Sequence, residues 1–165
     1  MTAPVIRQAV EADVPELMDM ILALADHHDE ADSVKNTPER LRQNLFSERP
    51  HFSVHVVEAP ADSDFRLNGF SLWFPAYSTW EGGRMIHMED LYVRPESRGT
   101  GAGKALLSNL ARIAVSDGYL RIEWMVAKTN EPGIRFYLAQ GARAMSEWES
   151  YQVDGDALRA LAAQQ

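Results

Sequence analysis

A cluster of glycines past the middle of the chain is the first feature whose residue types could do chemistry. Residues 98–104 read Arg-Gly-Thr-Gly-Ala-Gly-Lys. Because glycine has no Cβ, the backbone N–H groups of such a loop can turn toward a ligand without obstruction. A helix that begins at the loop adds about half a positive charge at its N-terminus. The spacing therefore predicts a phosphate site, and a diphosphate above all.

The segments on either side of this loop must position it. Residues 86–93 are typical of a strand, and Arg94-Pro95 closes it. After the loop, apolar residues recur at spacings of three and four, which is typical of one helix face. These apolar residues are Ala102, Leu106, Leu107, Leu110, Ala111, Ile113 and Ala114. The glycines are thus expected at a strand-to-helix junction.

Two common phosphate motifs do not fit the loop. A phosphate-loop NTPase has four residues between its first glycine and Gly-Lys, and then serine or threonine. Here Gly99 and Gly103 have only three residues between them, and Ala105 follows Lys104. A dinucleotide fingerprint has its third glycine where Lys104 stands, and it usually falls in the first strand–helix unit. Both motifs are therefore set aside.

Composition narrows the class of protein. At 165 residues, the sequence predicts one domain over residues 1–165. It has no cysteine, which excludes disulfides and a catalytic thiol of the protein. The net charge of −8 argues against nucleic acid and suits a cationic substrate. Without a long apolar run or a signal-peptide pattern, we expect a cytoplasmic protein that does not interact with membranes.

The order of patterns along the chain predicts the fold class. Strands are expected over residues 5–8, 53–58, 69–77, 85–93, 121–126 and 148–153. Asp13 and Thr37 are expected to cap two early helices, with Glu16 reaching back in the first, and Leu41 and Leu45 facing inward in the second. Two later helices follow Gly101 and Asn130, and a short one ends the chain. The order predicts an α/β fold with a mixed sheet, mostly antiparallel, and flanking helices.

The loop pattern R-G-x-G-x-G resembles the pyrophosphate loop of the GNAT family of N-acetyltransferases, which bind acetyl-CoA. The chain looks most like the diamine acetyltransferases, the spermidine/spermine and thialysine group. Four stretches carry the resemblance: residues 5–13, 88–93, 98–103 and 130–142. It implies the acyl-CoA N-acyltransferase fold, a homodimer, and transfer of acetyl from acetyl-CoA to a small primary amine. The amine, a polyamine, diamine or lysine analogue, would attack directly in a ternary complex.

The resemblance also implies where acetyl-CoA binds. The loop would hold the diphosphate, with countercharge from Lys104 and Arg98, although Arg98 could instead anchor the loop. The end of the preceding strand would pair with pantetheine where it splays from residues 121–126, and the Leu91 amide would hold the oxyanion. Asn130 could contact the cofactor arm or only cap its helix. The implied residues are Leu91, Tyr92, Val93, Arg98, Gly99, Thr100, Gly101, Ala102, Gly103, Lys104 and Asn130.

Two residues are the catalytic candidates. By resemblance, Tyr137 is the general acid that protonates the leaving thiolate; otherwise it is a packed helix tyrosine. Glu89 is the candidate base, because an amine at neutral pH must lose a proton before it attacks. Alternatively, Glu89 and Asp90 bind the ammonium or form a salt bridge. In a regular strand these two carboxylates would face opposite sides.

The amine site is expected to include His27, His28, Trp80, Glu89 and Asp90. The resembled enzymes have an acidic, aromatic region where this chain has His27 and His28, which favours a shorter amine over spermidine. The adjacent histidines indicate a solvated segment, so no metal is expected. Trp80 could contact the substrate cation or pack on the surface. His87, on the face of Glu89, could line the pocket or be an ordinary strand histidine.

Two other functions stay open at this point. A protein N-terminus or lysine could be the acceptor, because an acidic loop attracts a basic peptide. A non-catalytic acyl-CoA-binding module is the third hypothesis, against which the presence of both Glu89 and Tyr137 counts.

Overall fold

The computed structural model describes residues 3–164 of the chain. They form two compact units, of which the first ends at Met125 and the second begins at Val126. The first unit holds a five-stranded sheet with its helices, and the second holds the helices α4 (Glu131–Ala139) and α5 (Gly155–Ala162). Each unit is described by itself.

The sheet is mixed, as the sequence predicted. Its strands follow chain order, β1-β2-β3-β4-β5, and the first three pairings are antiparallel while β4 and β5 are parallel. The strands are β1 (Ile6–Gln8), β2 (Ser53–Glu58), β3 (Leu67–Ser78), β4 (Gly83–Val93) and β5 (Ile122–Glu123). The long antiparallel ribbon of β3 and β4 is the centre of this unit.

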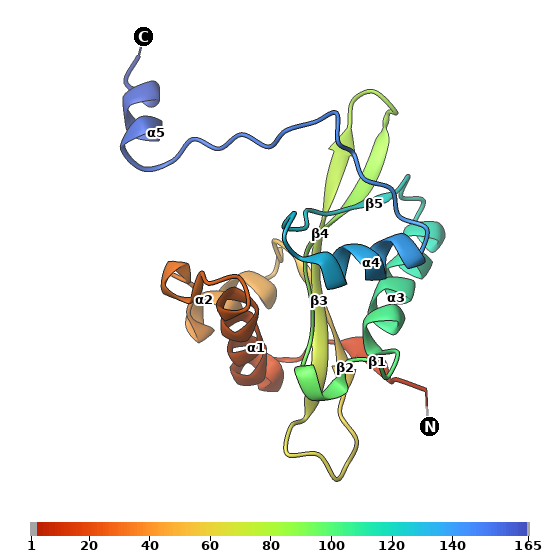
Figure 1. Ribbon diagram of the computed structural model, residues 1–165. Coiled ribbons are helices and arrows are strands. Elements are labelled where there is room, and N and C mark those ends of the chain that lie inside the picture. The colour runs from red at the N-terminus through yellow and green to blue at the C-terminus, as the bar shows by residue number, and fades with distance from the viewer. Residues whose placement is uncertain (1–2, 165) are drawn as a thin grey trace. The chain divides into compact units, whose positions relative to one another are not determined.

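Helices cover both faces of the sheet. Figure 1 shows α1 (Val14–Asp26) and α2 (Pro38–Leu45) on one side and α3 (Ala102–Ser116) on the other. The larger apolar cluster lies under α1 and α2, where Leu41 and Leu45 are buried as predicted. A smaller cluster joins Val57 of β2 to Ala102 and Leu106 of α3. Three short 3₁₀ turns complete the unit: η1 (Glu11–Asp13), η2 (Ala31–Ser33) and η3 (Pro95–Ser97).

Two predicted strands differ from the structure. The strand expected over residues 121–126 is reduced to β5, whose residues pair only with Ile86 and His87. The strand expected over residues 148–153 is wrong, because these residues have no regular structure. A strand needs a neighbour for its backbone groups, and among residues 126–164 there is no strand. None of the side chains in that range is buried.

Asp13 has a different role from the predicted helix cap. It precedes α1, but its side chain does not cap that helix. Instead the buried carboxylate accepts hydrogen bonds from Arg7 Nη1 at 2.6 Å, Arg66 Nη2 at 3.1 Å and the Val10 N–H at 2.9 Å. Burial opposes ionisation, but the Arg7 bond and the Val10 N–H outweigh it, so the pKa of Asp13 is lowered. Asp13 therefore ties β1 to the start of β3.

Glu16 does not reach back to the helix start either. Its carboxylate accepts the backbone N–H groups of Arg66 and Leu67, at 3.2 and 3.1 Å, where β3 begins. The cap predicted at Thr37 is confirmed, since its Oγ1 accepts from the Arg40 N–H at 3.2 Å. Capping is thus local at α2, whereas Asp13 and Glu16 bind residues 66 and 67, where β3 begins.

A half-buried histidine gives the fold a pH dependence. The Trp73 indole N–H donates to Nδ1 of His55 at 3.2 Å, so that nitrogen must be unprotonated. Burial lowers the pKa of His55. The unfolded chain therefore takes up this proton at a higher pH than the folded chain, and stability falls as pH drops below the ordinary histidine value of about 6.5.

We expect His55→Asn to weaken this dependence, because the asparagine oxygen can accept from Trp73 but does not titrate near neutral pH. The measurement is the melting temperature of both proteins between pH 7.5 and 5.5. The wild type should lose more stability on acidification than the variant. Identical losses would contradict a contribution from His55.

Candidate active site

The glycine loop has open space in front of it. It follows η3, and Gly101 is the residue before the first turn of α3. Gly99 and Gly101 have φ angles of +77° and +92°, which side-chain-bearing residues rarely adopt. A Cβ added at either position would have no neighbour within 4 Å. The Thr100 hydroxyl donates to the Ser97 carbonyl at 2.7 Å and braces the turn.

The amides at the start of α3 are available to an anion. The bond from the Ala105 N–H to the Gly101 carbonyl, 2.9 Å long, is the first of the helix, so the amides before it have no intrahelical partner. Arg98 Nε donates to the Val93 carbonyl at 3.2 Å, which favours the anchoring role for Arg98. Lys104 is exposed in the first turn of α3. These features fit a diphosphate.

A substitution at Gly101 tests this loop. Gly101→Ala is expected to raise the Kd for acetyl-CoA about tenfold, because the methyl group strains the turn by about 1 kcal/mol and enters the open space. Titration calorimetry measures the Kd. Gly118→Ala is the matched control, since Gly118 ends α3 with φ of +71° and an equally open Cβ position. Gly118→Ala should lower stability by a similar amount and leave the Kd for acetyl-CoA unchanged. Equal effects of the two variants on the Kd would contradict the assignment of the loop as the diphosphate site.

The central strand has a β-bulge at Glu89. Leu72 of β3 pairs with Asp90, but the next residue, Trp73, pairs with Met88, so Glu89 has no partner on β3. The bulge interrupts the alternation of β4 side chains between the two faces of the sheet. Asp90 therefore lies opposite Leu72, on the face that α1 and α2 cover.

The bulge overturns the expectation that Glu89 and Asp90 act on opposite sides. His87 lies opposite Phe74, two residues from Leu72, and so shares the face of Asp90. The Glu89 carboxylate also turns to this group, with Oε2 3.4 Å from Nε2 of His87. Bulges of this kind often re-aim side chains beside active sites. Three titratable residues, at positions 87, 89 and 90, thus lie close together along β4.

Asp90 has the most perturbed environment of the three. Burial raises its pKa to about 6, and the negative charge of Glu89 adds to the rise. A positive charge placed there would stabilise both carboxylates. The bulge is therefore suited to a cationic group such as an ammonium.

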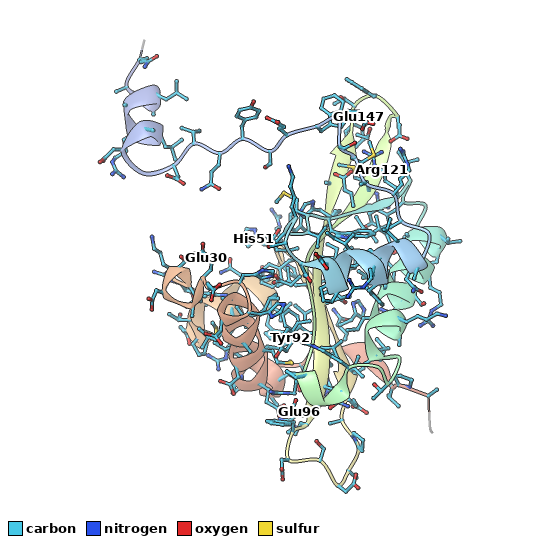
Figure 2. All side chains as sticks on the ribbon, viewed as in Figure 1. Glu30, His51, Tyr92, Glu96, Arg121 and Glu147 are labelled. Carbon is cyan, nitrogen blue, oxygen red and sulfur yellow. The ribbon has the colours of Figure 1, made fainter. Side chains whose placement is uncertain are left out.

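Beyond the bulge, β4 has no strand on its second side. The pairing with β5 covers Ile86 and His87 only, so residues 88–93 have no strand partner there within residues 3–164. The side chains of Leu91 and Val93 pack with Ala102 and Leu106, whereas Tyr92 is buried on the opposite face. Figure 2 shows Tyr92 on the side of the sheet that α1 covers. A ligand at this edge would meet backbone rather than the side chain of Tyr92.

The other predicted substrate residues are exposed. His27 and His28 follow α1, with their ring centroids 5.2 Å apart. Trp80, at the turn between β3 and β4, is 85% exposed. In the described part of the chain, no three or more histidine, aspartate or glutamate side chains are placed to hold a metal ion. The same residues include no helix long and apolar enough to span a bilayer.

Two predicted site residues belong to the second unit. Asn130 Oδ1 accepts the Gly133 N–H at 3.0 Å, so it caps α4. Tyr137 is half-buried in this helix, with its ring centroid 5.2 Å from that of Phe136. Gly141, with φ of +87°, follows the end of the helix. The segment thus forms the capped helix that the sequence predicted.

Comparisons with known proteins agree with the fold and the family resemblance. A family model described as the acetyltransferase (GNAT) family matches residues 18–142. Thialysine N-epsilon-acetyltransferase of Sus scrofa is 36% identical over 169 residues, covering 98% of this chain and 99% of that protein. L-ornithine N5-acetyltransferase NATA1 of Arabidopsis thaliana is 33% identical over 124 residues, covering 68% of this chain and 54% of that protein.

A solved structure extends the likeness to the fold of nearly the whole chain. An integron cassette protein from V. cholerae superposes with a TM-score of 0.79 at 24% identity, covering 99% of this chain and 100% of that one. The family model and the thialysine relative define the class of protein as an N-acetyltransferase. The chain belongs to the acetyltransferase (GNAT) family.

Proposed function

We propose that this N-acetyltransferase transfers acetyl from acetyl-CoA to the primary amine of a small diamine or lysine analogue. The observation that carries the proposal is the bulge of β4, which gathers the Glu89 and Asp90 carboxylates on one face of the sheet. Burial and the neighbouring charge of Glu89 raise the pKa of Asp90 to about 6, so a bound ammonium would stabilise its ionised form. The net charge of −8 would draw such a substrate from solution.

The choice of a lysine-like amine over a polyamine has two supports. The exposed His27 and His28 lie after α1, where an acidic region would suit an extended polycation. The relatives named above are a thialysine and an ornithine acetyltransferase, and those substrates are short. Both observations favour a compact amine that places one ammonium at the bulge.

The residues of the chain would divide the reaction among them. Acetyl-CoA, when bound, supplies the activated acetyl thioester. The amides that precede α3, with Lys104, would hold its diphosphate, and residues 91–93 would hold its pantetheine arm. Glu89 would accept the proton of the attacking ammonium, the Leu91 amide would donate to the oxyanion, and Tyr137 would protonate the departing thiolate. The absence of cysteine favours direct attack over an acyl-enzyme.

We further propose that the protein is a cytoplasmic homodimer. The resemblance to the diamine acetyltransferases supports this proposal, because it implies a homodimer. Light scattering during gel filtration measures the mass, and a monomer at micromolar concentration would contradict the dimer.

Thiol release from acetyl-CoA against a panel of amines tests the proposed function. The panel includes lysine, thialysine, ornithine, short diamines, spermidine, amino sugars and a basic peptide. We expect the highest kcat/KM for a lysine-like amine, with spermidine at least tenfold lower. Preference for the peptide would assign a peptide acetyltransferase. Acetyl-CoA binding without turnover on any amine would assign a binding module instead.

A further inference from the structure

The sheet does not hold Glu89 in place. The bulge leaves this residue without a partner on β3, and 55% of its side chain is exposed. Its carboxylate Oε2 lies 3.4 Å from Nε2 of His87, and within residues 3–164 no other ion pair or hydrogen bond holds its side chain. A flexible glutamate side chain pays conformational entropy whenever it must adopt one orientation.

His87, in contrast, is firmly held. Its backbone lies between two strands, opposite Phe74 of β3 and beside Glu123 of β5. Its ring packs on that of Phe74 with a centroid distance of 4.9 Å, and its side chain is only 23% exposed. The imidazole is therefore a fixed point next to an exposed carboxylate.

We propose that His87 is a positioning residue that fixes the Glu89 carboxylate for the amine substrate. This role rests on the proposed function, in which Glu89 takes the proton of the amine. With a proton on Nε2, the imidazole can donate to Glu89 Oε2, and a contact of 3.4 Å can tighten when substrate binds. Glu89 is then held to one orientation while Asp90, the next residue, keeps its place opposite Leu72 of β3.

A pair of substitutions separates this role from packing. His87→Leu fills the space against Phe74 but has no nitrogen, and it should lower kcat about tenfold with little change in the KM for the amine. His87→Gln places an amide N–H near the same point and should restore kcat to within about twofold of the wild type. The Kd for acetyl-CoA and the melting temperature should stay constant. His87→Met repeats the test if the leucine variant does not fold.

A double-mutant cycle shows whether His87 acts through Glu89. Glu89→Gln alone should lower kcat about a hundredfold, within the range of general-base effects. Adding His87→Leu to that variant should cost less than a further twofold, because the carboxylate to be positioned is gone. Glu123→Gln is the matched control: it lies beside His87 in the sheet, but its carboxylate pairs with Arg121 at 3.0 Å. This control should leave kcat unchanged.

The outcomes keep the two proposals apart. An active wild type whose turnover is unaffected by His87→Leu would overturn the role of His87 alone. A full tenfold loss in the Glu89→Gln background would overturn it as well, because His87 would then act independently. A wild type that acetylates no amine would overturn the proposed function and this role together.

Discussion

Replacement of Tyr137 by phenylalanine is expected to lower kcat for amine acetylation about a hundredfold. The departing thiolate leaves with a negative charge, and a phenol that donates its proton in the transition state is worth roughly this factor. Phenylalanine keeps the half-buried ring that packs on Phe136, so α4 and its Asn130 cap should form normally. Steady-state kinetics with the best amine of the panel measures the loss.

The binding of acetyl-CoA decides what a loss of turnover means. A general acid acts only in the transition state, so the Kd for acetyl-CoA should change less than twofold. Tyr151→Phe is the control, since this exposed tyrosine of the same unit bonds to the Glu149 side chain at 3.3 Å and has no proposed part in the chemistry. Unchanged turnover in Tyr137→Phe would remove Tyr137 from the mechanism.

Replacement of Asp13 by alanine is expected to lower the free energy of unfolding by about 3 kcal/mol. Removing one partner of a buried ion pair is strongly destabilising, because the groups around it lose their compensation. Here the Val10 N–H and the guanidinium groups of Arg7 and Arg66 lose their shared acceptor. Urea unfolding measures the change. Asp32→Ala, an exposed aspartate of the turn η2, should change stability by less than about 0.5 kcal/mol.

The same carboxylate should shape the stability of the protein in acid. Its pKa is lower in the folded chain than in the unfolded chain. The stability that it contributes is therefore complete above the ordinary aspartate value of about 3.9 and is lost as pH falls through the folded value. The difference in stability between the wild type and Asp13→Ala should shrink below about pH 4. A difference that stays constant down to pH 2 would contradict this linkage.

Features that depend on neighbouring residues were predictable from the sequence. The glycine loop, the helix after it, the Thr37 cap and the inward Leu41 follow from short spacings, and the structure has each of them. The mixed sheet follows from the order of strand and helix patterns. The family resemblance rests on four local stretches, one of which is the glycine loop, and the family model agrees with it.

Features that depend on distant pairing were not predictable. The bulge exists because Trp73 pairs with Met88, and no spacing within residues 83–93 reveals that register. Asp13 was expected to cap a helix because it stands just before a helical pattern. Its actual partner Arg66 is far along the chain, so no local pattern reveals it. Residues 148–153 were expected to form a strand, yet a strand forms only where another strand offers its edge. The contact between His87 and Glu89 follows from the bulge. It was therefore not predictable without the pairing register of β3 and β4.

The bulge means that β4 contains one residue more than its pairing with β3 requires. Every pair on either side of Glu89 is already in register, and Met88 and Asp90 already face opposite sides. A chain lacking Glu89 could therefore close the same hairpin without a gap and fold at least as well. Its sheet would be complete, and the candidate base would be missing. At this position the residue that the proposed chemistry needs is one that the sheet does not need. Deleting Glu89 would therefore remove the candidate base and leave the pairing of β3 and β4 intact.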